Sequence, residues 1–144
     1  MKEFKYKEIT EKIIGAAMKV HLTLGTGFRE IIYQRTMALQ MEADGLLFIR
    51  ECNMHVYYLE KQIGERRVDF FVENKICTEL KAIQKLEPVN FAQARNYLEA
   101  FNKEVGLLIN FGSISLEFKR LENPKYNPAL IRHPALSELS QKSL

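Results

Sequence analysis

The sequence predicts one α/β (α+β) domain that contains an antiparallel hairpin. Apolar residues recur at helical spacing over about residues 8–23 and 88–101. Between them, about residues 46–83 are rich in β-branched and aromatic residues with short turn signals, which is typical of strands. A chain of 144 residues with 47% hydrophobic residues suits one sizeable core. We therefore assign one domain to residues 1–122 and a C-terminal tail to residues 123–144.

Two helices are expected at the N-terminal end. The first covers about residues 8–23, and the LGTG segment after it contains two glycines that interrupt helical structure. The second runs from Phe28 to about Ala43, and the Asp-Gly pair that follows ends it. The expected apolar stripe of this helix comprises Phe28, Ile32, Thr36 and Leu39.

Four strands are expected next, because the spacing of apolar residues is no longer helical. They cover about residues 46–52, 54–60, 65–72 and 75–83, with turns at Lys61–Gly64 and Glu73–Lys75. A further helix begins at Pro88. Residues 105–112 are expected to form a buried strand, and residues 114–121 its hairpin partner. The tail holds three of the four prolines, so we expect it to be poorly ordered.

Composition narrows the class of protein. A formal net charge of +3 permits a nucleic-acid partner without arguing for one. The two cysteines, Cys52 and Cys77, form no metal-binding or disulfide pattern, which fits a reducing cytosol. The sequence has no apolar run long enough for a membrane helix and no signal-peptide core. A cytoplasmic protein is expected.

A hairpin centred on Asn74 would bring ionisable residues together. The expected cross-strand pairs are 72/76, 71/77, 70/78 and 69/79. Asp69 would then face Glu79, with Lys81 two residues further along the same face. The other face, which supplies the core, would hold Val68, Phe70, Val72, Ile76, Thr78 and Leu80.

This arrangement of charges indicates the type of reaction that the site could catalyse. Opposed carboxylates repel each other in a cross-strand pair, and a divalent cation held by their oxygens removes that repulsion. A lysine beside such a site can orient or deprotonate a water and offset charge on a phosphate. The layout of Asp69, Glu79 and Lys81 therefore suits metal-assisted phosphodiester hydrolysis.

A structural interpretation of the same residues is also open. Glu-x-Lys is a weak pattern that recurs at Glu73–Lys75 and Glu117–Lys119. A one-residue slip in register would reverse the faces of a strand. In that case the hairpin would present a solvated face with an Asp69–Lys81 salt bridge.

Segments outside the hairpin favour the functional interpretation. GFREIIY holds Gly27, Glu30 and Tyr33 in a G-x-x-E-x-x-Y pattern, preceded by VHLTLGTG. VDFFVENKICTELKA, QARNYL and VGLLINFG follow in that order. Over about residues 8–121 the chain resembles the GxxExxY protein family, a branch of the PD-(D/E)XK nuclease-like superfamily. The resemblance implies a restriction-endonuclease-like core in which helices pack on a mixed sheet. Its order is a helix, a three-stranded antiparallel meander, a helix and a further strand.

The resemblance also implies a set of site residues. Asp69 corresponds to the central aspartate of the motif, and Glu79 and Lys81 to its E-x-K. Glu30 would be the additional acid and the third metal ligand, although a first-turn acid favoured by the helix dipole is the alternative. Val68 stands where the name of the superfamily places proline.

Accessory roles are implied for residues on the flanking helices. Gln93 and Tyr97 resemble a Q-x-x-x-Y pair that could orient Lys81 or touch a nucleic-acid backbone, with packing as the alternative. Tyr33 is expected in the core or in support of the site. His21 resembles a metal-binding histidine of related exonucleases, although a lone helical histidine is more often packed or hydrogen-bonded.

Arg66 and Arg67 precede Asp69 and could contact phosphate, and exposed arginines at a strand end explain them equally well. The sequence thus supports a nuclease that requires Mg²⁺ or Mn²⁺ and acts on DNA. The alternative is a catalytically inactive nucleic-acid-binding or scaffold protein with the same fold. A homodimer that shares one duplex is a further expectation.

Overall fold

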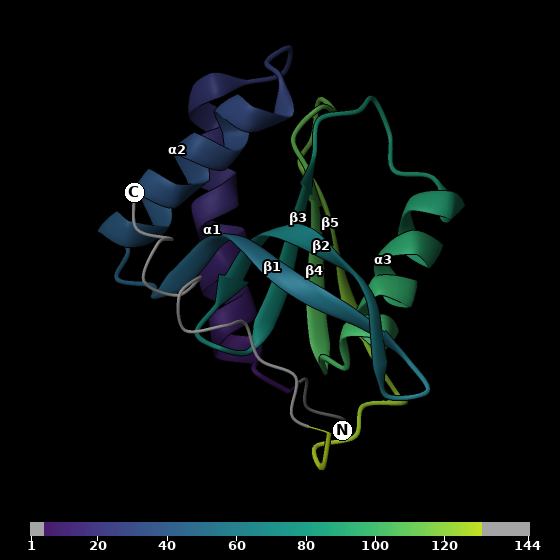
Figure 1. The fold of residues 1–144 in the computed structure, drawn as a ribbon. Helices are drawn as coiled ribbons and strands as arrows, with labels where there is room; N and C mark the ends of the chain where they lie inside the picture. Colours follow the sequence, from purple (N-terminus) through teal and green to yellow (C-terminus); the bar gives the residue numbers. More distant parts are fainter. Residues whose placement is uncertain (1–4, 131–144) are drawn as a thin grey trace, which may run out of the picture.

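The fold is a mixed sheet flanked by helices, seen in a computed structural model that describes residues 5–130 (Figure 1). Its elements are α1 (Lys7–Leu24), α2 (Glu30–Ala43), β1 (Phe48–Tyr58), β2 (Lys61–Val72), β3 (Ile76–Lys81), α3 (Pro88–Phe101), β4 (Val105–Asn110) and β5 (Glu117–Glu122). The five strands lie in the order β1-β2-β3-β4-β5. Only the β3–β4 pair is parallel, with α3 as its crossover. The predicted fold class is confirmed.

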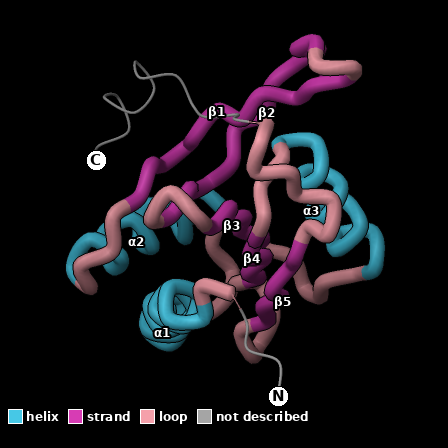
Figure 2. The backbone as a smooth tube through the Cα atoms, turned by 90° about the horizontal axis from the view of Figure 1, so that it is seen from below, coloured by secondary structure: helices cyan, strands magenta, loops and turns pink. Residues whose placement is uncertain are grey.

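The sheet separates two apolar clusters. Helices α1 and α2 cover one face, and α3 covers the other (Figures 1 and 2). The first cluster combines α1 and α2 side chains such as Ile13 and Met37 with Phe70 and Leu80 of the sheet. The second packs Leu98 and other α3 side chains against the opposite face. The β2–β3 hairpin, which carries the predicted site, belongs to the sheet between these two clusters.

The predicted strands need correction in the first half of the sheet. The two strands expected before Lys61 are one continuous β1, and Lys61–Gly64 belongs to β2 instead of forming a turn. The chain reverses at Leu59 and Glu60, where φ is 48° and 60°. Left-handed backbone of this kind is usually formed by glycine or asparagine in two-residue hairpins, so sequence alone gave no turn signal there.

The apolar stripe expected on the second helix is also wrong. Helix α2 begins at Glu30, and two members of that stripe, Phe28 and Leu39, are 47% and 65% exposed. The buried face is rotated by about one residue and comprises Tyr33, Gln34, Met37, Ala38 and Met41. The Tyr33 ring stacks on Phe111 with 4.8 Å between ring centroids, which anchors the helix in this rotation.

The chain beyond β5 stays in contact with the domain as far as it is described. The Asn102 side-chain amide donates hydrogen bonds to the carbonyl oxygens of Asn127 and Leu130, each at 2.8 Å. Residues 131–144 of the predicted tail lie outside the described residues. Among residues 5–130, none of the helices has the length and apolar character needed to cross a membrane.

Candidate active site

The β2–β3 hairpin has the expected register over its first three pairs. Val72 pairs with Ile76, Phe71 with Cys77, and Phe70 with Thr78. At the next position the Asp69 Oδ2 atom accepts a hydrogen bond of 2.8 Å from the Leu80 backbone N–H. The Asp69 carboxylate thus takes the place of a backbone carbonyl at the end of this ladder and lies close to Glu79.

Strand β2 changes its facing at Asp69, which corrects one residue of the predicted core face. Val68 is buried in the α3-side cluster, whereas Phe70 is buried in the cluster on the α1 and α2 side. The partner strand is irregular at the same level, since Glu51 has a φ of 52° and the β1–β2 pairs skip it. Strict alternation along β2 therefore fails at the position that carries the acid.

A residue that sequence reasoning missed holds Asp69 from the α2 side. The Gln34 Nε2 atom donates a hydrogen bond of 2.7 Å to Asp69 Oδ1. Gln34 is buried and lies four residues after Glu30, on the same side of the helix. That spacing is the available signal, but a glutamine inside a helix is commonplace and by itself indicates no function.

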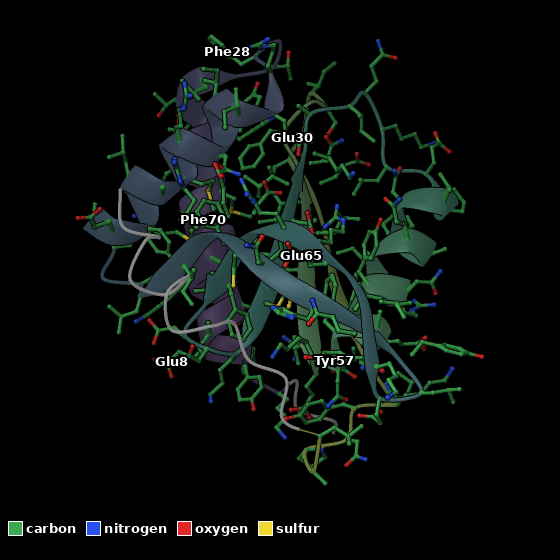
Figure 3. All side chains as sticks on the ribbon, in the orientation of Figure 1. Glu8, Phe28, Glu30, Tyr57, Glu65 and Phe70 are labelled. Atoms are coloured by element: carbon green, nitrogen blue, oxygen red, sulfur yellow. The ribbon has the colours of Figure 1, made fainter. Side chains whose placement is uncertain are left out.

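Glu30 lies in the first turn of α2, between the helix and the sheet (Figure 3). The residue keeps solvent access, yet the protein around its carboxyl displaces enough water to raise the pKa of that group. The Asp69 carboxylate raises the pKa of Glu30 further, and the cations of Lys81 and Arg66 act in the opposite direction. The carboxyl of Glu30 therefore shares an electrostatic environment with the hairpin.

Glu79 faces the α3 layer and has a cation of its own. Its carboxylate forms an ion pair with Arg66, whose guanidinium lies over the Tyr97 ring, 4.1 Å from the centroid. Burial, opposed by Arg66 and reinforced by Asp69, raises the pKa of Glu79 to about 7. The attraction of Arg66 thus offsets only part of the cost of burying this carboxylate.

Lys81 ends β3, and the backbone around it is held firmly. The Lys81 carbonyl accepts a 2.9 Å hydrogen bond from the Phe111 N–H. The buried Asn110 side chain bonds both the N–H and the carbonyl of Ile83, at 3.0 and 2.9 Å. Gly112 passes so close that an added Cβ would lie 2.3 Å from the Ile83 oxygen. Asn110 and Gly112 thereby fix the strand end that presents Lys81, and sequence reasoning identified neither.

The two remaining helical candidates near α2 contact backbone. The Tyr33 hydroxyl donates to the Gly25 carbonyl at 2.6 Å and accepts from the Phe28 N–H, so it holds the loop that leads to Glu30. The His21 Nε2 atom lies 2.9 Å from the carbonyl oxygen of Ser113, which can only accept. His21 is therefore arranged as a hydrogen-bond donor in the structure.

The remaining candidates divide between the two layers. Tyr97 takes part in the site through Arg66, whereas Gln93, one turn earlier on α3, is exposed. The Arg67 side chain is 58% exposed and bonds Glu51 at 3.1 Å. The two neighbouring arginines therefore have different partners, and only Arg66 contacts a predicted site residue.

The chemistry of the acidic residues fits a hard divalent cation, because every donor is an oxygen atom. The carboxylates by themselves do not form a complete metal site. Within residues 5–130, no group of three or more His, Cys, Asp or Glu side chains is arranged to hold a metal ion. Asp69 influences both Glu30 and Glu79, and Arg66 pairs with Glu79. Convergence of three carboxylates on one cation remains a prediction.

Comparison with known proteins identifies a family. Residues 7–121 match the model of the family described as the PD-(D/E)XK nuclease superfamily. No curated protein matches the chain. The solved structure titled "Crystal structure of SSO0001" is similar at 15% sequence identity and a TM-score of 0.44, over 81% of this chain and 79% of that chain. That likeness is too distant to transfer any property.

Proposed function

This chain belongs to the PD-(D/E)XK nuclease superfamily, and on that premise we propose that it is a Mg²⁺- or Mn²⁺-dependent nuclease that hydrolyses phosphodiester bonds of DNA. We further place it in the GxxExxY branch, on the pattern of Gly27, Glu30 and Tyr33. One observation carries the proposal. The Asp69 carboxylate is held at 2.7 Å by the Gln34 side chain of α2 and at 2.8 Å by the Leu80 N–H of β3, so it lies between the helix that carries Glu30 and the strand that carries Glu79 and Lys81.

The residues that would hold the cation are Glu30, Asp69 and Glu79. A bound Mg²⁺ or Mn²⁺ would polarise the phosphate and lower the pKa of a coordinated water. The protein contributes the placement of these donors. Asp69 is held on both oxygens, by Gln34 and by the Leu80 N–H, so its orientation is set before any ligand arrives.

The positive charge of Lys81 acts on Glu30, where it lowers the pKa of the carboxyl. An ammonium at this place can orient the attacking water and stabilise negative charge that develops on the phosphate. The rigid backbone around Asn110 supports this role, because a positioning group acts only if its strand end is held in place.

A second candidate function is a nucleic-acid-binding or scaffold protein without catalytic activity. The ion pair between Arg66 and Glu79 favours it, because a carboxylate with a resident guanidinium partner has less need of a metal. A homodimer and a cytoplasmic location remain predictions for either function.

A DNA cleavage assay with Mg²⁺ or Mn²⁺ tests the proposal. We expect the wild type to cut plasmid or linear DNA, and Asp69→Ala and Lys81→Ala each to lower the rate by roughly a hundredfold or more. Lys119→Ala is the matched control, because it removes the exposed lysine of another Glu-x-Lys pattern. Its rate should equal that of the wild type.

Two outcomes would count against the proposal. Unchanged cleavage in both Asp69→Ala and Lys81→Ala would show that the assigned site is wrong. A wild type that binds DNA but cuts no substrate with either metal would favour the second function.

A further inference from the structure

Gln34 combines burial with an unmatched hydrogen-bonding atom. The residue is only 6% exposed, and its Nε2 atom donates to Asp69 Oδ1 at 2.7 Å. The Oε1 atom of the same amide is buried and, among residues 5–130, has no hydrogen-bond partner. A buried acceptor without a partner lowers the stability of the folded state. Such an atom beside an acidic cluster is a sign of a missing ligand.

The orientation of this amide follows from its neighbour. A carboxylate accepts hydrogen bonds and donates none, so the nitrogen of Gln34 must be the atom that faces Asp69. Rotating the amide by half a turn would place two acceptors against each other. Gln34 Oε1 is therefore held in its unpartnered position by the same contact that orients Asp69.

The surroundings point to a cation as the partner. Glu30 and Gln34 are four residues apart on one side of α2, and Gln34 bonds Asp69. Glu79, the other acid, forms an ion pair with Arg66 on the α3 side. Two carboxylates and one amide oxygen thus remain on the α2 side, and all three are hard oxygen donors of the kind that Mg²⁺ and Mn²⁺ bind.

We propose that Gln34 Oε1 is a ligand of the divalent cation together with Glu30 and Asp69, in the position that the predicted ligand set assigns to Glu79. This inference rests on the metal dependence of the proposed function and deepens it. It also accounts for the absence, among the described residues, of a group of three metal-binding acids, because one donor of the set is an amide. Gln34 and the Leu80 N–H bond different oxygens of Asp69, and a carboxylate oxygen that accepts one hydrogen bond has a second lone pair with which it can bind a metal.

A different role for Gln34 predicts a different result. If the side chain served only to hold Asp69, its N–H group would be the essential part. If it binds the cation, the oxygen is essential. Gln34→Met removes both groups at similar volume, whereas Gln34→Glu keeps an oxygen and removes the donor. The two variants therefore separate the roles.

Calorimetric titration of the full chain with Mn²⁺ is the first test. We expect Gln34→Met to weaken binding by about tenfold or more relative to the wild type. Gln40→Met is the matched control, because Gln40 lies further along α2 and makes the same type of contact, from its Nε2 atom to Asp44 Oδ1 at 3.0 Å. The control should bind Mn²⁺ as the wild type does.

Gln34→Glu supplies the second test and remains decisive if Gln34→Met fails to fold. We expect it to bind Mn²⁺ at least as tightly as the wild type. Its melting temperature should also rise more on adding Mn²⁺, because the cation relieves repulsion between the new carboxylate and Asp69. Binding by Gln34→Glu that is as weak as that of Gln34→Met would overturn the ligand role.

The two proposals fail in different ways. A wild type that binds no Mn²⁺ would overturn the metal dependence and, with it, this inference. A wild type that binds Mn²⁺, with Gln34→Met equal to it in affinity, would overturn the role of Gln34 alone and leave the proposed function standing.

Discussion

The two acids of the β2–β3 hairpin have different neighbours. Asp69 accepts hydrogen bonds from two neutral donors, the Gln34 side chain of α2 and the Leu80 N–H of β3, which orient it without cancelling its charge. Glu79 is buried toward α3 against the Arg66 guanidinium, which lies over the Tyr97 ring. One pair of adjacent strands thus presents one acid without a resident cation and one acid with its own.

The surroundings of Asp69 and Glu79 differ because the two helical layers supply different groups to the hairpin. Strand β2 changes the direction of its side chains between Val68 and Phe70, so the hairpin has contacts with both helical layers where it carries its acids. The α2 side gathers oxygen atoms, and the α3 side supplies a cation and an aromatic ring. We therefore expect α2-side residues to control metal binding, and α3-side residues to control stability and its dependence on pH.

The largest effect on stability is expected for Arg66→Met. The substitution leaves Glu79, whose side chain is only 14% exposed, buried without its counter-charge. We expect the free energy of unfolding at about pH 8 to fall by roughly 3 kcal/mol. Urea denaturation measures this loss. The loss should be smaller at about pH 5, because protonated Glu79 needs no counter-ion.

Arg67→Met is the control for that experiment. Arg67 is the next residue along β2, but its side chain is 58% exposed and pairs with Glu51. Its loss should change the free energy of unfolding by less than about 1 kcal/mol. Equal effects of the two substitutions would show that the buried Arg66–Glu79 pair contributes no more to stability than the exposed Arg67–Glu51 pair.

A pH-dependent effect of intermediate size is expected from Glu79. Its pKa is about 7 in the folded protein against an ordinary value of 4.5, so the folded state binds the proton more tightly than the unfolded state. The resulting stabilisation is complete below the ordinary pKa and is lost as the pH rises through the folded pKa. In EDTA, we expect the free energy of unfolding to fall by roughly 2 kcal/mol between about pH 5 and about pH 8.

Glu79→Gln tests the source of that slope. Glutamine does not titrate, so the part of the pH dependence due to residue 79 should disappear. Urea denaturation at a series of pH values gives the comparison. A slope in Glu79→Gln as steep as in the wild type would assign the pH dependence to other groups.

The smallest effect is expected at Tyr97. Tyr97→Leu removes the ring beneath the Arg66 guanidinium, 4.1 Å away, and should lower the free energy of unfolding by about 1 kcal/mol. Tyr97→Phe keeps a ring in place and should cost less. A leucine variant as stable as the wild type would mean that the stacking over Tyr97 contributes nothing measurable.

Much of this arrangement was predictable from local pattern. Period-two alternation around Asn74 predicted three cross-strand pairs of the hairpin that the structure contains. Helical spacing located α1 and α3 within one or two residues. The predicted set Glu30, Asp69, Glu79 and Lys81 still awaits its functional test, although shared electrostatics link these residues.

Other features depended on contacts that no local pattern encodes. The rotation of α2 is set by stacking of Tyr33 on Phe111, a residue far along the chain. The turn at Leu59 and Glu60 uses left-handed backbone without the usual glycine. Gln34, Asn110 and Gly112 are ordinary residue types in sequence, and their importance arises only from what lies beside them.

Residue type and spacing alone were enough to establish the fold class, the hairpin and a concentration of acids upon it, because these follow from short-range periodicity. The tertiary structure decided which layer each acid faces. It thereby decided that Glu79 forms an ion pair with Arg66 and that Asp69 accepts a hydrogen bond from Gln34. The reason is physical. Burial and charge compensation depend on atoms brought together across the sheet, and distance along the chain carries no information about them.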